Sequence, residues 1–166
     1  MNKILIQNPR IINEGRSFIG SVLVEGDKIA AVFEGEVPGN VRAEANQVID
    51  ATGKWLIPGV IDDQVHFRDP GLTHKGDIGT ESRAAVAGGV TTFMDMPNTK
   101  PQTTTIADLE WKFNRAAEVS RANYSFFFGG PHANMDEIRR LDRSRVPGLQ
   151  LFLGSSTGNL LVEQKN

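Results

Sequence analysis

Apolar and polar positions alternate in short runs over the first part of the chain, which is the period-2 pattern of strands that bury one face. Glycine and proline residues separate the runs. The pattern predicts a small antiparallel β unit with strands at 4–6, 11–12, 21–24, 28–33 and 47–50. Gly26 lies in a polar turn between two of the runs, so residues 22–29 are predicted to form a hairpin.

From Trp55 onward the apolar runs lengthen and alternate with segments of helical period. Strands are predicted at 60–67, 90–96, 124–128 and 148–153, and helices at 78–87, 106–121 and 135–142. The strands are apolar on both faces, which is typical of a buried parallel sheet. A (β/α) barrel and a doubly wound sheet would both give this pattern. Residues 160–166 are predicted to begin a further element.

The helix predicted at 106–121 has Thr105 as its N-cap. Leu109, Phe113 and Ala116 form an apolar stripe along it. We interpret it as an ordinary packing helix.

Composition and charge narrow the function classes. The chain has 166 residues, 39% hydrophobic and 23% charged, with a formal net charge of -2 spread over mixed acids and bases. Neither a nucleic-acid nor a membrane partner is therefore predicted, and no apolar run approaches the roughly 20 residues that span a bilayer. We expect a cytoplasmic protein. Because cysteine is absent, any metal must be held by histidines, carboxylates or a modified side chain.

Polar groups cluster at the end of the strand predicted at 60–67, where active sites of parallel α/β folds lie. The period of two predicts that the polar side chains of Asp62, Gln64, His66 and Arg68 all project to one face and share the interior of the barrel. The spacing alone leaves a second interpretation equally open, in which His66 is a hydrogen-bonded structural histidine and Arg68 pairs with a neighbouring aspartate.

Two other histidines are weaker candidates. His74 follows Pro70-Gly71 in a polar loop, where an exposed residue without function is the favoured interpretation. His132 follows the strand predicted at 124–128, and Pro131 and Asn134 favour a loop before a helix. The loop 154–158 lacks the lysine of a phosphate-binding loop and is predicted to shape the mouth of a site.

Three ordered motifs resemble those of dihydroorotases and the wider cyclic amidohydrolase superfamily, which includes hydantoinases and allantoinases. The first is PGVIDDQVHFRDPG at 58–71, where the family pattern is P-G-x-I-D-x-H-x-H-x-R-x-P-G. The second is ESRAAVAGGVT at 81–91, and the third is MPNT at 96–99. The resemblance implies a partial (β/α)8 barrel at 56–166, limited to its first four strands, and a small β side domain at 1–55 that is composite in the family.

The resemblance also implies an activity and its residues. Dihydroorotases interconvert dihydroorotate and N-carbamoyl-L-aspartate in pyrimidine biosynthesis, with two zinc ions that activate a bridging hydroxide. His66 would be a metal ligand, and Arg68 and Asn98 would bind the substrate carboxylate and amide. Gln64 and Gln150 occupy family ligand positions, the second that of a carboxylated lysine, and their amides are weaker donors.

The general base and the remaining ligands of the family are expected beyond Asn166, so the resemblance implies no catalytic residue within this chain. Activity of the chain alone is accordingly not expected. The alternative is a catalytically inactive or truncated dihydroorotase homologue that acts as a binding or scaffold subunit. Self-association into a homo-oligomer is compatible with either hypothesis.

Overall fold

The computed structural model describes residues 1–154, 160 and 162. The chain divides into two compact units, Met1–Pro58 and Gly59–Asn166. The first unit extends beyond the predicted boundary at residue 55, because strand β6 (Trp55–Leu56) pairs with a strand of that unit. The assignment of the two units as a composite side domain and part of a barrel stays a prediction.

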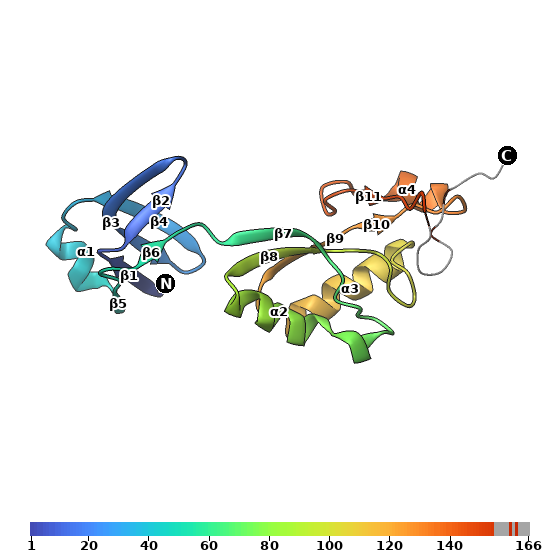
Figure 1. The fold of residues 1–166 in the computed structure, drawn as a ribbon, viewed down its shortest axis with the longest axis horizontal. Coiled ribbons are helices and arrows are strands. Elements are labelled where there is room, and N and C mark those ends of the chain that lie inside the picture. Colours follow the sequence, from blue (N-terminus) through green and yellow to red (C-terminus); the bar gives the residue numbers. More distant parts are fainter. Residues whose placement is uncertain (155–159, 161, 163–166) are drawn as a thin grey trace. The chain divides into compact units, whose positions relative to one another are not determined.

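The first unit is built around one six-stranded sheet (Figure 1). Its elements are β1 (Lys3–Gln7), β2 (Arg10–Asn13), β3 (Arg16–Glu25), β4 (Lys28–Glu34), α1 (Gly39–Glu44), β5 (Gln47–Asp50) and β6. The long strand β3 pairs antiparallel with β1, β2 and β4. The predicted hairpin is confirmed as β3 and β4, with a register shift between Leu23 and Val24.

The prediction of a purely antiparallel unit is wrong. β5 pairs parallel with β1, and β6 pairs parallel with β2. A parallel pair needs a crossover connection, and the connection from β4 back to β5 contains the short helix α1, which the sequence pattern did not predict. The helix has no buried residue and no side-chain cap, so it lacks both signals on which such a prediction depends.

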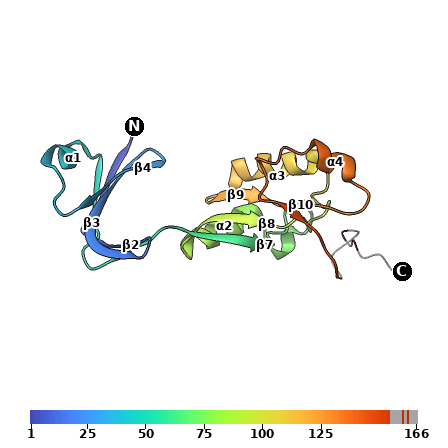
Figure 2. The same cartoon turned by 90° about the horizontal axis from the view of Figure 1, so that it is seen from above.

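The second unit alternates strands and helices, as predicted. Its elements are β7 (Val60–Val65), the 3₁₀ turn η1 (Thr73–Lys75), α2 (Ile78–Ala87), β8 (Val90–Asp95), α3 (Ile106–Val119), β9 (Asn123–Phe126), β10 (Phe128–Gly129), α4 (Met135–Arg140) and β11 (Leu149–Gln150). β7, β8 and β9 form a parallel sheet in that order (Figure 2), and β10 pairs parallel with β11. The fold of this unit is therefore α/β.

Three predicted strands are shorter than expected. The strand predicted at 60–67 ends at Val65, and the one predicted at 148–153 is limited to Leu149–Gln150. The strand predicted at 124–128 breaks at Phe127, whose amide donates to the Asp95 carbonyl while β10 turns toward β11. The predicted loop 154–158 and element 160–166 lie almost entirely outside the described residues.

Helices α2 and α3 lie on one face of the β7-β8-β9 sheet (Figure 1). Each begins with a capping box, formed by Asp77 with Thr80 and by Thr105 with Asp108. The core beneath them is rich in phenylalanine, with ring centroids of Phe67 and Phe93 4.5 Å apart. Core packing of this kind fixes the ends of β7 and β8, where the candidate site residues lie.

Candidate functional site

Strand β7 carries a bulge just before the predicted site residues. Asp62 is opposite Phe93 and Val65 is opposite Asp95, so three steps along β7 match two along β8. The backbone N–H of Gln64 donates to the Asp62 carboxylate at 3.1 Å. The predicted common face for Asp62, Gln64, His66 and Arg68 is therefore wrong, because the bulge interrupts the alternation and Arg68 has a φ of 61°.

His66, Arg68 and Asn98 nevertheless meet at the ends of β7 and β8. His66 Nδ1 lies 2.9 Å from Asn98 Oδ1, and Arg68 Nη1 donates to the Asn98 backbone carbonyl at 3.3 Å. Asn98 is buried, with an exposed fraction of 8%, whereas the imidazole is exposed. The three residues that the motifs indicated thus form one cluster, in which the Asn98 side chain contacts His66 and the Asn98 backbone carbonyl contacts Arg68.

The contact with Asn98 defines the roles of the two ring nitrogens. The amide oxygen can only accept, so the bond assigned to it requires a hydrogen on His66 Nδ1. In the neutral ring, Nε2 then carries the free lone pair. This is the tautomer in which an imidazole binds a metal through Nε2 while a second group orients the ring.

A buried ion pair lies behind this cluster. Lys112 of α3 and Asp95 of β8 are both fully buried, with Nζ and Oδ2 2.5 Å apart. Asp95 Oδ1 accepts from the Phe67 amide at 2.9 Å, and Lys112 Nζ also donates to the Met96 carbonyl at 3.2 Å. Burial lowers the pKa of Lys112, and the adjacent Asp95 carboxylate opposes that shift.

Sequence reasoning missed this pair, although both residues left a signal. Lys112 stands between Leu109 and Phe113 on the apolar stripe of its helix. Asp95 ends a strand that is otherwise apolar or hydroxylated. A charge at a position that must be buried requires a partner, and this rule identifies both residues before their partners are known.

The loops after β7 and β8 are also bound to each other. The Lys100 amide donates to the Pro70 carbonyl at 3.0 Å. Helix α3 also binds the loop after β7, because Arg115 Nε donates to the buried Asp69 carboxylate at 3.4 Å. Gly71 has a φ of 81°, and a Cβ at this position would lie 1.8 Å from the Lys100 carbonyl oxygen. Only glycine therefore allows this close approach of the two loops.

The other sequence candidates lie outside the cluster. Gln64 is exposed, and Gln150 of β11 donates through Nε2 to the neighbouring Leu151 carbonyl at 3.2 Å. His74 is exposed in η1, and His132 is exposed in a turn, with Nε2 3.0 Å from the Val162 carbonyl oxygen. These four residues have no hydrogen bond to His66, Arg68 or Asn98 among the described contacts.

The described residues do not form a complete zinc site. Zinc sites use three or four protein ligands drawn from histidine, cysteine and carboxylates. Across residues 1–154, 160 and 162, no three histidine, aspartate or glutamate side chains are grouped so that they could hold one ion. His66 Nε2 is the one imidazole lone pair that the cluster offers, so the described residues alone do not fit the metal.

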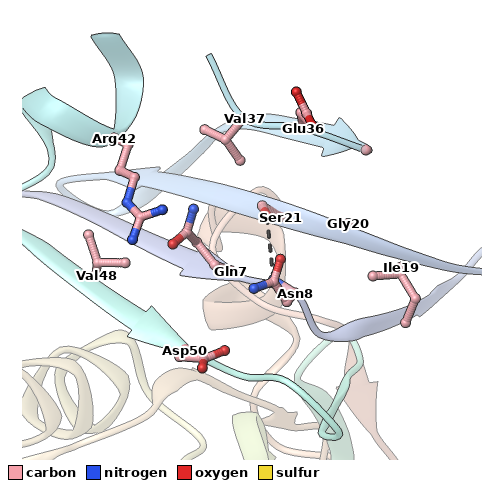
Figure 3. A pocket seen from close by; sticks show the side chains of 11 residues that line it. Gln7, Asn8, Ile19, Gly20, Ser21, Glu36, Val37, Arg42, Val48 and Asp50 are labelled. Atoms are coloured by element: carbon pink, nitrogen blue, oxygen red, sulfur yellow. Dashed lines mark hydrogen bonds between the residues drawn. The ribbon is translucent and has the colours of Figure 1, made fainter. Parts of the chain in front are cut away.

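A separate hollow of about 630 Å³ lies in the first unit (Figure 3). Figure 3 shows Gln7, Arg42 and Asp50 around it, and the backbone N–H of Asn8 donates to the Ser21 hydroxyl. None of the predicted site residues lines this hollow, and it contains no histidine. We therefore place the candidate chemistry at the ends of β7 and β8.

Comparison with known proteins identifies relatives of this chain. A family model described as Dihydro-orotase-like matches residues 53–130. An allantoinase of Streptomyces avermitilis is 36% identical over 157 residues, which are 93% of this chain and 34% of that protein. A dihydroorotase of Methanosarcina acetivorans is 35% identical over 167 residues, 99% of this chain and 34% of that protein.

The fold comparison gives the same class. The solved structure of an L-hydantoinase from Arthrobacter aurescens matches with a TM-score of 0.87 and 29% identity, over 99% of this chain and 36% of that one. Dihydroorotases, allantoinases and hydantoinases together define the class of cyclic amidohydrolases. Within this class, the chain belongs to the dihydro-orotase-like family. It spans about a third of the length of the relatives it matches.

Proposed function

We propose that the chain is part of a hydrolase of cyclic amide C–N bonds that interconverts dihydroorotate and N-carbamoyl-L-aspartate in pyrimidine biosynthesis. The observation that carries the proposal is the contact of Asn98 with both His66 and Arg68. In this proposal the second unit provides the first four strands of a (β/α)8 barrel, and the first unit is part of a composite side domain.

The cluster has the groups that a ring amide with a carboxylate substituent requires. Arg68 uses one N–H for the Asn98 carbonyl, so its other guanidinium donors can bind a carboxylate. Asn98 uses Oδ1 for His66, and its Nδ2 can donate to a ring carbonyl. His66 Nε2 would be one zinc ligand, and the other ligands would lie outside the described residues, because Gln64 and Gln150 lie outside the cluster and their neutral amides are weak donors.

A second candidate function is that of a non-catalytic relative, which binds a partner without turnover. The observation that favours it is the ligand count, since the described residues offer no three grouped ligands for one metal ion. Such a subunit would retain the fold and the Asn98 contacts but lack zinc. The two candidates therefore differ in metal content as well as in activity.

One experiment separates these candidates. Zinc is measured by elemental analysis of the dialysed full-length protein, and opening of dihydroorotate, hydantoin and allantoin is assayed on the same sample. The proposal expects bound zinc and preferential turnover of dihydroorotate. Turnover of hydantoin or allantoin instead would keep the class and overturn the substrate. A folded protein with neither zinc nor turnover would favour the non-catalytic function.

A further inference from the structure

We propose that the buried pair of Lys112 and Asp95 positions the site. By ending the hydrogen bonding between β7 and β8, the pair lets the two chain segments diverge, and their side chains His66, Arg68 and Asn98 then come into contact. The inference rests on the proposed function, because it assigns a role in the same site. Both residues bond the backbone of Phe67 and Met96, next to the cluster, and are therefore positioning residues.

The pair occupies the place of the next rung in the parallel ladder. The Met96 amide donates to the Val65 carbonyl at 2.9 Å, which is the last regular bond between the two strands. In a continuing parallel ladder, the Phe67 amide would next donate to the Met96 carbonyl. Here the Phe67 amide instead donates to Asp95 Oδ1, and the Met96 carbonyl accepts from Lys112 Nζ.

The two backbone groups that would bond each other are therefore both satisfied by the ion pair. Phe67 lies between His66 and Arg68, and Met96 lies two residues before Asn98. The pair thus ends the ladder at the point where the chain segments must diverge to present their side chains. A further rung would bring these backbone segments together and displace His66 relative to Asn98.

Stability alone does not account for the pair. A buried ion pair can often be replaced by apolar residues of similar volume without loss of stability. The property that apolar residues cannot supply is the pair of directed bonds, an acceptor for the Phe67 amide and a donor for the Met96 carbonyl. This difference makes the role testable apart from the contribution to folding.

The test compares two double variants of the full-length protein. Asp95→Leu with Lys112→Met removes both directed bonds from the interior. Asp95→Asn with Lys112→Met is the matched control: it loses the Lys112 donor to the Met96 carbonyl, but the asparagine Oδ1 still accepts from the Phe67 amide, and an occupied Phe67 amide is enough to prevent the bond to Met96. Melting temperature, kcat and KM for dihydroorotate are measured for both, together with a crystal structure of the leucine variant.

We expect kcat/KM of the leucine variant to fall about 100-fold, mainly through kcat, because a small misplacement of site groups costs about this much. Its melting temperature should stay close to that of the control. The control should stay within about threefold of the parent. Equal kcat/KM in both variants would overturn the proposal. If the leucine variant does not fold, a crystal structure of the control decides. A Phe67 amide bonded to the asparagine Oδ1, with kcat/KM within about threefold of the parent, supports the role. A Phe67 amide bonded to the Met96 carbonyl, with kcat/KM and the contact between His66 and Asn98 unchanged, contradicts it.

The crystal structure separates this inference from the proposed function. We expect a new hydrogen bond from the Phe67 amide to the Met96 carbonyl, with His66 Nδ1 moved beyond hydrogen-bond distance of Asn98 Oδ1. If the parent protein opens no ring but the variant shows this shift, the proposed function fails and the positioning role stands. An unchanged contact between His66 and Asn98 would refute the positioning role even in an active enzyme.

Discussion

His66 Nδ1 and Asn98 Oδ1 lie 2.9 Å apart, although the two residues are 32 positions apart in the sequence. The contact joins the segments that follow two neighbouring parallel strands, β7 and β8. It orients an exposed imidazole through a buried amide, so the ring is fixed from the protein side and open at Nε2. The site can therefore be disturbed through Asn98 without changing His66 itself.

Replacing Asn98 with alanine should lower zinc affinity and ring opening together. The imidazole loses the acceptor that fixes its tautomer, and loss of such an orienting group typically costs about 10-fold to 100-fold. Zinc titration and steady-state kinetics on the full-length protein measure the effect. Asn114→Ala, at an exposed position of α3, is the matched control. An Asn98→Ala protein with parental zinc affinity would show that the contact does not orient a ligand.

Replacing Arg68 with alanine should weaken binding of dihydroorotate but leave zinc content unchanged. Loss of hydrogen bonds to a charged group costs about 1.5–3 kcal/mol, so KM should rise accordingly. Dihydrouracil has the same ring without the carboxylate, and its turnover should change little. The control is Arg143→Ala, which removes an exposed arginine of the same unit. Equal losses of zinc and of dihydroorotate binding would argue against the carboxylate-binding role.

Replacing Lys112 alone with methionine should destabilise the protein strongly. Asp95 would remain buried opposite an apolar group, and breaking a buried pair from one side costs about 3–5 kcal/mol. Urea unfolding followed by circular dichroism measures the free energy of unfolding. Adding Asp95→Asn should recover most of the loss, because it removes the uncompensated charge. Lys75→Met, at an exposed position, is the control, and a loss for Lys112→Met no larger than for this control would contradict the argument.

Replacing Gly71 with alanine should cost more stability than the same change at Gly53. Both glycines have positive φ, 81° and 76°, so both alanines would carry the left-handed backbone strain of about 1–2 kcal/mol. A Cβ at Gly71 also meets the Lys100 carbonyl, while Gly53 has nothing within 4 Å. Thermal unfolding should place Gly71→Ala well below Gly53→Ala, and coincident melting temperatures would show that the loops separate at little cost.

Local signals predicted much of the fold. The helix expected at 78–87 matches α2 at both ends, because Asp77 caps its start and Gly88-Gly89 follow its end. Features that depend on a neighbouring strand escaped prediction. The bulge in β7 is defined by its register with β8, and the parallel pairings of β5 and β6 depend on strands far away in sequence.

The candidate site was predicted unevenly for the same reason. Strand periodicity grouped His66 and Arg68 with Asp62 and Gln64, a grouping that the bulge breaks. The ordered motifs instead indicated His66, Arg68 and Asn98, which do meet. Lys112 and Asp95 are 17 positions apart, and no local sequence pattern shows which buried charge pairs with which.

Replacing Glu110 with glutamine should remove a contribution to stability that depends on pH. Arg145 holds this carboxylate through two bonds, one of them from Nη2 to Oε2 at 3.1 Å, and the bonding lowers the pKa of Glu110 below its usual 4.5. A carboxyl group whose pKa is lower in the folded state stabilises the fold above its unfolded pKa. This contribution is lost as the pH falls below 4.5 through the folded pKa.

The parent and Glu110→Gln proteins should therefore differ in free energy of unfolding at pH 7 and converge in acid. The difference should be small, since both side chains are partly exposed and water screens the pair. Urea unfolding at a series of pH values measures it, with Glu14→Gln at an exposed turn as the control. Added salt should reduce the difference at pH 7. A difference that persists unchanged into acid would show that Glu110 acts through packing, because protonation then leaves its contribution intact.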